Sequence, residues 1–136
     1  MKKLLILALA LVAAACGSNG ETAEKEAPAT LIEVAGTELW KIELTQLAAD
    51  RLDIQTTEVS ATDAGMSVPS DAVIIIPDGT YWVYTNPEPL TYLREELTSV
   101  YEEDLHAFFE NGPAPGSKVV TVGVPELYGT EFGIGK

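Results

Sequence analysis

The chain has 136 residues, and its 21 Asp and Glu against 8 Lys and Arg give a formal net charge of −13. This length suits one folded domain, and the acidic balance disfavours binding to nucleic acid or to anionic lipid headgroups. The single cysteine excludes an intramolecular disulfide. We interpret the acidic residues as a solvated surface. A cation-binding role is the alternative, but the acids are scattered along the chain.

Residues 1–15 have the pattern of an export signal. A basic start, "MKK", is followed by "LLILALALVAAA", which is shorter than the about 20 apolar residues of a membrane-spanning helix. The small residues directly before Cys16 resemble a lipobox, where the cysteine is diacylated and becomes the first residue, although Ala13 stands where Leu is usual. The alternative is ordinary signal-peptidase cleavage after Ala-x-Ala, which would leave a free thiol.

Lipidation at Cys16 would anchor the protein firmly to a membrane, because several acyl chains bind far more strongly than one. Loss of residues 1–15 would leave 6 Lys and Arg against 21 Asp and Glu, a net charge of −15. Residues 16–30 contain the cysteine and the small, polar stretch "GSNGETAEKEAPAT". We expect this segment to be a flexible tether and residues 31–136 to form the folded domain.

The first part of the domain predicts strands around one short helix. The stretch "LIEVAGTELWKIEL" alternates apolar and polar residues and reads as two short strands broken near Ala35-Gly36. Thr45 is a good helix N-cap, and "QLAADRL" after it predicts about two turns of helix. The next stretch, "DIQTTEVSA", is β-rich and is broken by "TDAG" at 62–65.

The middle of the domain contains the strongest hairpin signal. A β-branched run at 73–76 is followed by the turn sequence Pro77-Asp78-Gly79 and by the aromatic strand sequence "YWVY". The sequence "NPEP" then bends the chain. Residues 90–109 alternate as strands do, but they also show the spacing of a helix, so periodicity leaves both open.

The last part reads as a loop, "NGPAPGSK", a buried strand, "VVTVGV", and a glycine-rich tail, "PELYGTEFGIGK". We expect this tail to be partly paired and partly frayed. Together these elements predict a mainly β fold, a small β-barrel or sandwich of short strands with one short α-helix.

The sequence offers little for catalysis. His106 is the only histidine, and a metal site needs several ligands at workable spacing. No serine lies in a nucleophile-elbow context and no glycine-rich loop has phosphate-binding spacing. We therefore predict that the protein is not an enzyme and has no catalytic residues, metal or cofactor. The aromatic residues could stack on bases, but the negative charge favours their use in a core or a protein contact.

The stretch "VPSDAVIIIPDGTYWVYTNPEPLTYLREELTSV" resembles the membrane-proximal part of periplasmic adaptor subunits, the HlyD-like membrane-fusion proteins of RND-type efflux pumps. The later stretch "PAPGSKVVTVGVPELYGTEFG" resembles a strand and ending of the same family, so the resemblance covers most of residues 38–133. The helical hairpin and lipoyl-like domain of full adaptors have no counterpart. The acidic "YEEDLHAFFENG" also departs from the family pattern.

The resemblance implies a non-catalytic interaction module that docks onto an RND-type or related transporter, or onto a full-length adaptor, and that is lipid-anchored outside the cytoplasm. It also implies strands over 90–109, with a turn near Glu103-Asp104. The expected contact strand is the exposed part of Tyr81 to Leu93. The partner-binding residues that we predict are Tyr81, Trp82, Tyr84, Asn86, Pro87, Pro89 and Tyr92.

A second hypothesis is a stand-alone lipoprotein that binds a small ligand or a metal ion. It requires a concave pocket faced by His106, Glu102 and Glu103.

Overall fold

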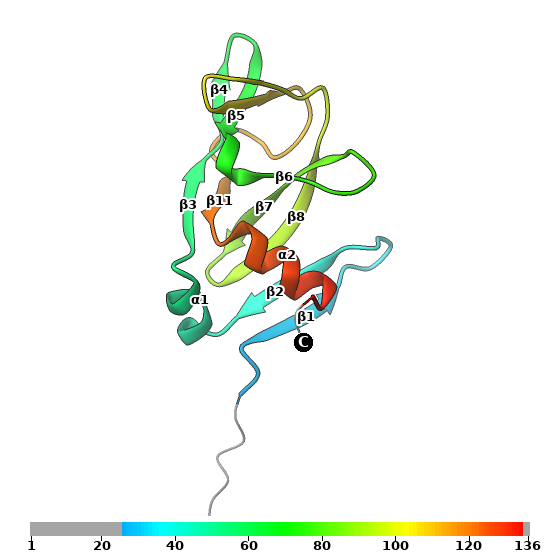
Figure 1. Ribbon diagram of the computed structural model, residues 1–136, viewed down its shortest axis with the longest axis vertical. Helices are drawn as coiled ribbons and strands as arrows, with labels where there is room; N and C mark the ends of the chain where they lie inside the picture. Colours follow the sequence, from blue (N-terminus) through cyan, green and yellow to red (C-terminus); the bar gives the residue numbers. More distant parts are fainter. Residues whose placement is uncertain (1–25, 135–136) are drawn as a thin grey trace, which may run out of the picture.

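The computed structural model describes residues 26–134 and has a mainly β fold, as predicted. Within these residues there are two antiparallel sheets and two short helices, and the sheets do not close into a barrel. The molecule is elongated, with the larger sheet and both helices at the end where the chain enters and the smaller sheet at the other end (Figure 1). The predicted export signal at residues 1–15 and the predicted lipidation of Cys16 lie outside the described residues.

The larger sheet has seven strands in the order β1-β2-β8-β7-β11-β3, with β6 also paired to β7. Its strands are β1 (Ala29–Glu33), β2 (Trp40–Leu44), β3 (Gln55–Glu58), β6 (Val73–Ile75), β7 (Tyr81–Glu88), β8 (Thr91–Leu97) and β11 (Lys118–Val122). The smaller sheet has the order β4-β5-β10-β9. Its strands are β4 (Ser60–Thr62), β5 (Gly65–Pro69), β9 (Tyr101–Glu103) and β10 (His106–Phe109).

The first elements agree with the sequence prediction. Strands β1 and β2 form a hairpin, with Leu31 paired to Ile42 on the buried side. The Thr45 hydroxyl accepts from the Ala48 amide at 3.2 Å and so caps α1 (Gln46–Leu52). Strand β1 begins at Ala29, two residues before the expected boundary of the domain.

The predicted hairpin is formed by β6 and β7, in register Val73 to Val83. At its turn the Asp78 carboxylate accepts from the Thr80 amide at 2.9 Å, a local bond that favours Asp in turns. Strand β7 continues through the predicted bend as far as Glu88, with a register shift against β8 between Thr85 and Glu88. The prolines therefore produce an irregular strand end rather than a break.

Strands occupy residues 91–109, as the family resemblance implies. Strand β8 pairs on both sides, with β7 and β2, and buries alternate residues such as Tyr92 and Arg94. The turn between β9 and β10 falls at Asp104 and Leu105, both with positive φ. The helical spacing of this stretch does not produce a helix, because pairing with β7 and β2 buries every second residue of β8.

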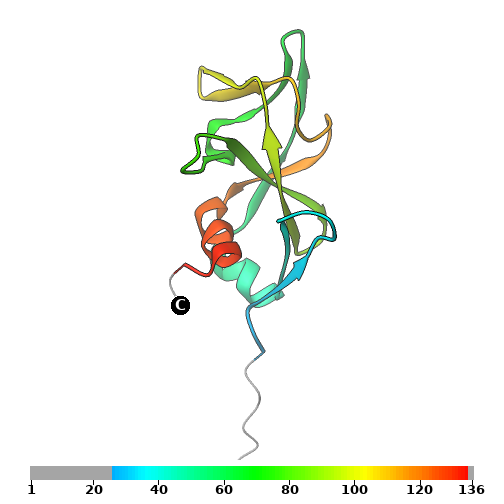
Figure 2. The same ribbon diagram turned by 90° about the vertical axis from the view of Figure 1, so that its right-hand side faces the viewer.

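The prediction for the C-terminal tail was wrong, because residues Val124–Phe132 form a second helix, α2. The helix starts with Pro125 at its first turn and ends at Gly133, whose φ of 66° is the left-handed conformation that closes many helices. Its apolar residues Val124 and Leu127 are buried in the core of the larger sheet. Figures 1 and 2 show α2 lying across that sheet, close to α1. Burial of this face stabilises a helix that its glycine content disfavours.

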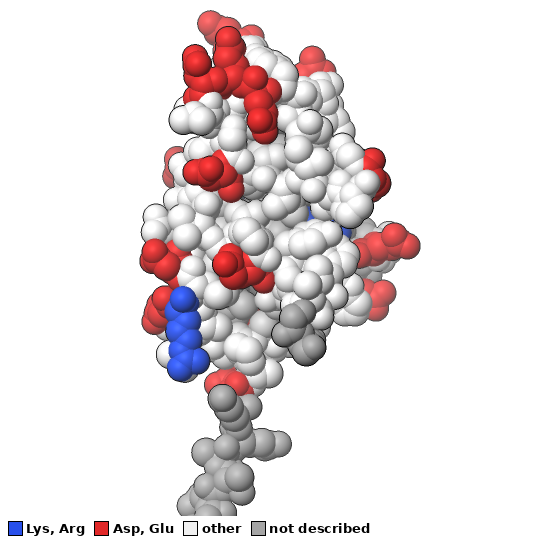
Figure 3. All heavy atoms as spheres, viewed as in Figure 1, with Lys and Arg blue, Asp and Glu red and all other residues white. Residues whose placement is uncertain are grey.

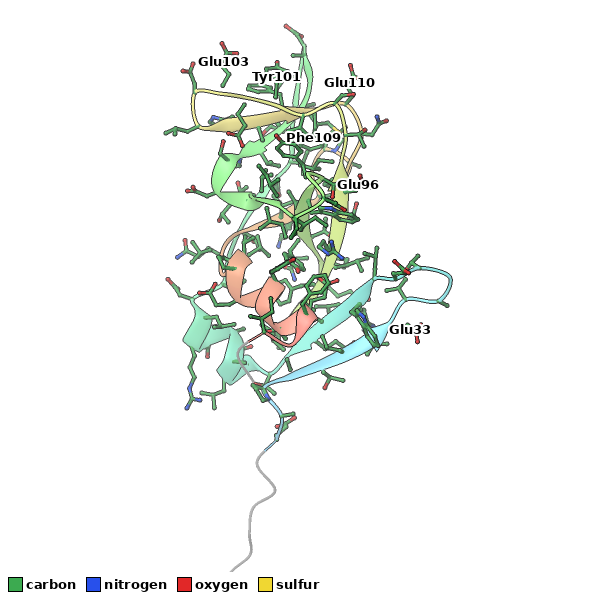
Figure 4. The ribbon with its side chains drawn as sticks, turned by 45° about the vertical axis from the view of Figure 1, so that its right-hand side comes forward. Glu33, Glu96, Tyr101, Glu103, Phe109 and Glu110 are labelled. Atoms are coloured by element: carbon green, nitrogen blue, oxygen red, sulfur yellow. The ribbon has the colours of Figure 1, made fainter. Side chains whose placement is uncertain are left out.

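Two cores hold the molecule together. The core of the larger sheet packs α1 and α2 against strands β2, β7, β8 and β11. The second core lies between the sheets, where Phe109 of β10 packs with Val83, Leu97 and Val119. Figure 4 shows Phe109 inside the molecule and Tyr101, Glu103 and Glu110 at the outer end of the smaller sheet. Strands β7, β8 and β11 contribute to both cores and so join the two regions.

Candidate functional site: an arginine between aromatic rings

The structure divides the seven predicted contact residues into three groups. Tyr84 and Tyr92 are buried in the core of the larger sheet. Tyr81 and Trp82 are half-buried at the start of β7, whereas Asn86, Pro87 and Pro89 lie at or just beyond its other end. A strand rises about 3.4 Å per residue, so Trp82 and Pro87 are about 17 Å apart. The predicted set therefore does not form one surface patch.

A buried polar cluster joins α2 to the sheet. The Tyr84 hydroxyl donates to Glu131 Oε2 at 2.5 Å, and Arg94 Nε donates to both carboxylate oxygens of Glu131, at 3.1 and 3.2 Å. Arg94 is 5% exposed and Glu131 is 6% exposed. Removing two charges from water is costly. In this cluster the charges of Arg94 and Glu131 compensate each other, and the Tyr84 hydroxyl donates a further hydrogen bond to the carboxylate.

Two aromatic rings bracket the guanidinium group. The Arg94 Cζ atom lies 4.2 Å from the centroid of the Trp82 ring and 5.0 Å from that of Phe132. The Trp82 indole nitrogen donates to Thr80 Oγ1 at 2.6 Å, which fixes the ring's orientation. Such contacts between a cation and an aromatic face are attractive, and more so away from water. We call Trp82, Arg94 and Phe132 together the arginine platform.

The platform has an outer margin that reaches solvent. Phe132 is 49% exposed and Trp82 is half-buried. Trp40 precedes Lys41, which pairs with Leu93, so side-chain alternation places Trp40 on the same sheet face as Arg94. Trp40 is 37% exposed. Three partly exposed aromatic side chains thus lie on one face, around a buried cation.

Arg94 keeps donors that Glu131 does not use. The hydrogen bonds of Arg94 within residues 26–134 involve only its Nε atom. No buried side-chain nitrogen or oxygen in that part of the chain lacks a hydrogen-bond partner. The terminal amino groups of Arg94 are therefore not completely buried, although the side chain as a whole is only 7% exposed. An amino group in this position can donate to an acceptor that approaches between the rings.

The cluster is unsuited to acid–base chemistry. Burial, and next the hydrogen bond to the Glu131 carboxylate, raise the pKa of Tyr84 far above its ordinary value of 10.0. Burial also raises the pKa of Tyr92. Both phenols stay protonated at neutral pH, so Tyr84 acts as a fixed hydrogen-bond donor. The arrangement positions groups for contact and offers no activated nucleophile or base.

The other end of β7 forms a shallow cleft of about 590 Å³. Pro87 and Pro89 line it opposite Lys118 at the start of β11. The Asn86 amide donates to the carbonyls of Glu88 and Thr91, at 2.7 and 2.9 Å, and thereby holds the irregular strand end. Asn86 thus has a structural role here, and the two prolines are the accessible members of this group.

The residues of the metal hypothesis lie on the smaller sheet. His106 pairs with Glu103 across the β9–β10 hairpin, whereas Glu102 pairs with Ala107 and so projects to the other face. Among residues 26–134, no three His, Cys, Asp or Glu side chains are grouped as ligands for a metal ion.

None of the helices within the described part of the chain is long and apolar enough to cross a membrane.

Sequence reasoning missed Glu131 and Phe132. A signal was present, because Val124, Leu127, Tyr128 and Glu131 follow helical spacing between Gly123 and Gly133, with Pro125 near the start. The pairing of Glu131 with Arg94, 37 residues earlier, has no local signal.

Comparisons with models of known protein families, with curated proteins and with solved structures give no match to this chain.

Proposed function

We propose that this protein is a non-catalytic interaction module, lipid-anchored through Cys16 outside the cytoplasm, that docks onto a transporter complex or onto an adaptor of such a complex. The proposal takes its partner class from the resemblance of residues 38–133 to efflux-pump adaptors. It takes its contact surface from the arginine platform. A module of this kind requires a rigid recognition surface and no reaction centre.

The observation that carries the proposal is the Arg94 side chain, held between Trp82 and Phe132 with terminal amino groups that are not completely buried. Trp, Tyr and Arg are the residues that most often dominate binding energy at protein interfaces. The ion pair with Glu131 fixes the guanidinium before any partner arrives. A partner that supplies a carbonyl or carboxylate group therefore meets an ordered site and loses less entropy on binding.

The test is recovery of partners from gently solubilised membranes with a tagged, full-length chain. We expect a transporter or adaptor to co-purify with the lipidated protein. Trp82→Ala should reduce that recovery by at least about tenfold, since truncation of a central interface aromatic commonly costs about 2 kcal/mol or more. Phe132→Ala, at a more exposed position, should reduce it less.

The matched control is Tyr101→Ala, which removes an exposed aromatic from the smaller sheet. Circular dichroism must show all variants folded. Equal recovery with Trp82→Ala and Tyr101→Ala would contradict the assignment of the surface. Pro87→Ala and Pro89→Ala would then test the cleft at the other end of β7.

A further inference from the structure

An apolar groove lies at the end of the molecule where the chain enters. It has a volume of about 1190 Å³ and is bounded by the first described residues, by α1 and by α2. Its apolar side chains include Leu31, Leu44, Leu47, Leu52, Pro125 and Ile134. This volume is larger than that of most small-molecule sites, about 300–1,000 Å³.

Two of these side chains are left largely in water. Leu47 is 59% exposed and Ile134 is 64% exposed. The Ile134 amide donates to the Gly129 carbonyl at 2.8 Å, a bond that closes α2 and holds Ile134 at the groove. Apolar side chains fixed around a groove, and still exposed, mark a surface that binds something apolar.

The path of the chain indicates which ligand can reach the groove. Glu26, Ala27, Pro28 and Ala29 line it themselves, so the chain arrives along its wall. Nine residues lie between Cys16 and Glu26, and a random-coil chain of nine residues would span about 15–18 Å. A group on Cys16 is therefore held near the groove at an effective concentration in the millimolar range.

We propose that this groove holds an acyl chain of the lipid carried by Cys16. The inference rests on the lipid anchor of the proposed function. An acyl chain is uncharged, long and apolar, and matches the apolar side chains of the groove, which include four leucines, two prolines and Ile134. A second copy of the protein would bring a strong negative charge to a wall whose charged residues, Glu26, Arg51 and Glu126, are themselves net negative.

The test is photo-crosslinking in intact cells with Leu47→p-benzoylphenylalanine in the full-length chain. Mass spectrometry of the N-terminal peptide first establishes that Cys16 is acylated; an unacylated Cys16 would overturn both this inference and the anchor. We expect a crosslink between the peptide that contains residue 47 and an acyl chain of the Cys16 lipopeptide of the same molecule. Leu105→p-benzoylphenylalanine is the control, because Leu105 is 85% exposed on the smaller sheet, and it should give no such product.

A crosslink to a second copy, to free membrane phospholipid or to no lipid at all would overturn the inference. Gly129→Leu provides an independent variant. A Cβ atom at position 129 meets only the Ile134 carbonyl oxygen, at 3.6 Å, and glycine is a poor helix former, so the variant should fold and fill the groove. It should reduce the crosslink at least fivefold. Recovery of a transporter through Trp82 should be unchanged by it, which separates the two proposals.

Discussion

The two sheets bury very different side chains. The larger sheet encloses the ion pair of Arg94 and Glu131 together with Thr85 and Thr91, whereas the buried polar residue of the smaller sheet is Ser67. In the larger sheet, the hydrogen bond from Arg94 to Glu131 therefore fixes the position of α2. The smaller sheet is held instead by apolar packing around Phe109. Buried polar groups must be paired with specific partners, so they select one arrangement more strictly than apolar contacts do.

Surface charge shows the same division. Residues 59–72 and 98–117, which form the smaller sheet and its connections, contain no Lys or Arg. Their acids are Asp63, Asp71, Glu102, Glu103, Asp104 and Glu110. Figure 3 shows acidic side chains gathered at that end of the face in view. Every Lys and Arg within residues 26–134 belongs to the larger sheet or to α1; these residues are Lys41, Arg51, Arg94 and Lys118. Among residues 26–134, only the larger sheet thus combines a Lys or Arg with aromatic rings, which is why we propose it as the contact surface.

The largest effect should come from Glu131→Ala. The substitution leaves Arg94 buried without its counter-charge, and breaking a buried ion pair in this way costs about 3–5 kcal/mol. Urea unfolding followed by circular dichroism measures the loss. Glu126→Ala, at an exposed position of the same helix, should change the free energy of unfolding by less than about 0.5 kcal/mol. Similar losses for the two variants would show that the ion pair contributes little.

The core between the sheets should respond to Leu97→Ala by about 2–4 kcal/mol, because Leu97 is 2% exposed and its truncation leaves a cavity. Both tryptophans, Trp40 and Trp82, lie in the larger sheet. Since β7, β8 and β11 contribute to both cores, we expect the two cores to unfold together. The unfolding midpoint of Leu97→Ala should then shift by the same amount whether it is followed by tryptophan fluorescence or by circular dichroism. Separate transitions would mean that the two regions unfold independently.

Alkaline pH should weaken the region around the ion pair. Folded Tyr84 keeps its proton above pH 10, whereas the unfolded phenol, with a pKa near 10.0, releases it. The folded state then binds more protons, so the contribution of Tyr84 to stability is constant below about pH 10 and falls by about 1.4 kcal/mol per pH unit above it. Urea midpoints between pH 9 and 11 measure the slope. Tyr84→Phe should be less stable at pH 8 but show a shallower decline, and parallel slopes would refute this assignment.

The smallest effect, with the opposite sign, is expected in the smaller sheet. Leu105 has a φ of 64° at an exposed turn, where a side chain is disfavoured and glycine is not. Leu105→Gly should therefore raise the free energy of unfolding by about 0.5–1 kcal/mol. Leu105→Ala keeps the strained conformation and should give no gain in thermal midpoint. If Leu105→Ala by itself raised the thermal midpoint, the effect would be due to removal of the leucine side chain instead.

Prediction from the sequence was most accurate for elements that depend on residues close together in the chain. Alternation predicted β1 and β2, the Thr45 cap predicted α1, and turn residues predicted the β6–β7 hairpin. The helix α2 was missed because its stability comes from burial of Val124 and Leu127 against distant strands rather than from local preference. Alternation places Tyr84 on the same face of β7 as Trp82. Tyr84 is nevertheless buried, because α2, which the sequence did not predict, supplies the Glu131 carboxylate that contacts its hydroxyl.

The candidate site was less predictable than the fold. Trp82 is among the contact residues predicted from the sequence, whereas Arg94 is not. Their partners on α2 depend on a contact over 37 residues, which no spacing rule encodes. The apolar groove is likewise formed from three separate segments.

The order of Tyr84, Arg94 and Glu131 along the chain has a consequence for folding during synthesis. Tyr84 and Arg94 are synthesised 47 and 37 residues before the carboxylate that satisfies them. Until that residue emerges, the larger sheet would have to bury an uncompensated cation, which is strongly unfavourable. A nascent chain should therefore be unable to complete the core of the larger sheet until residue 131 has been synthesised.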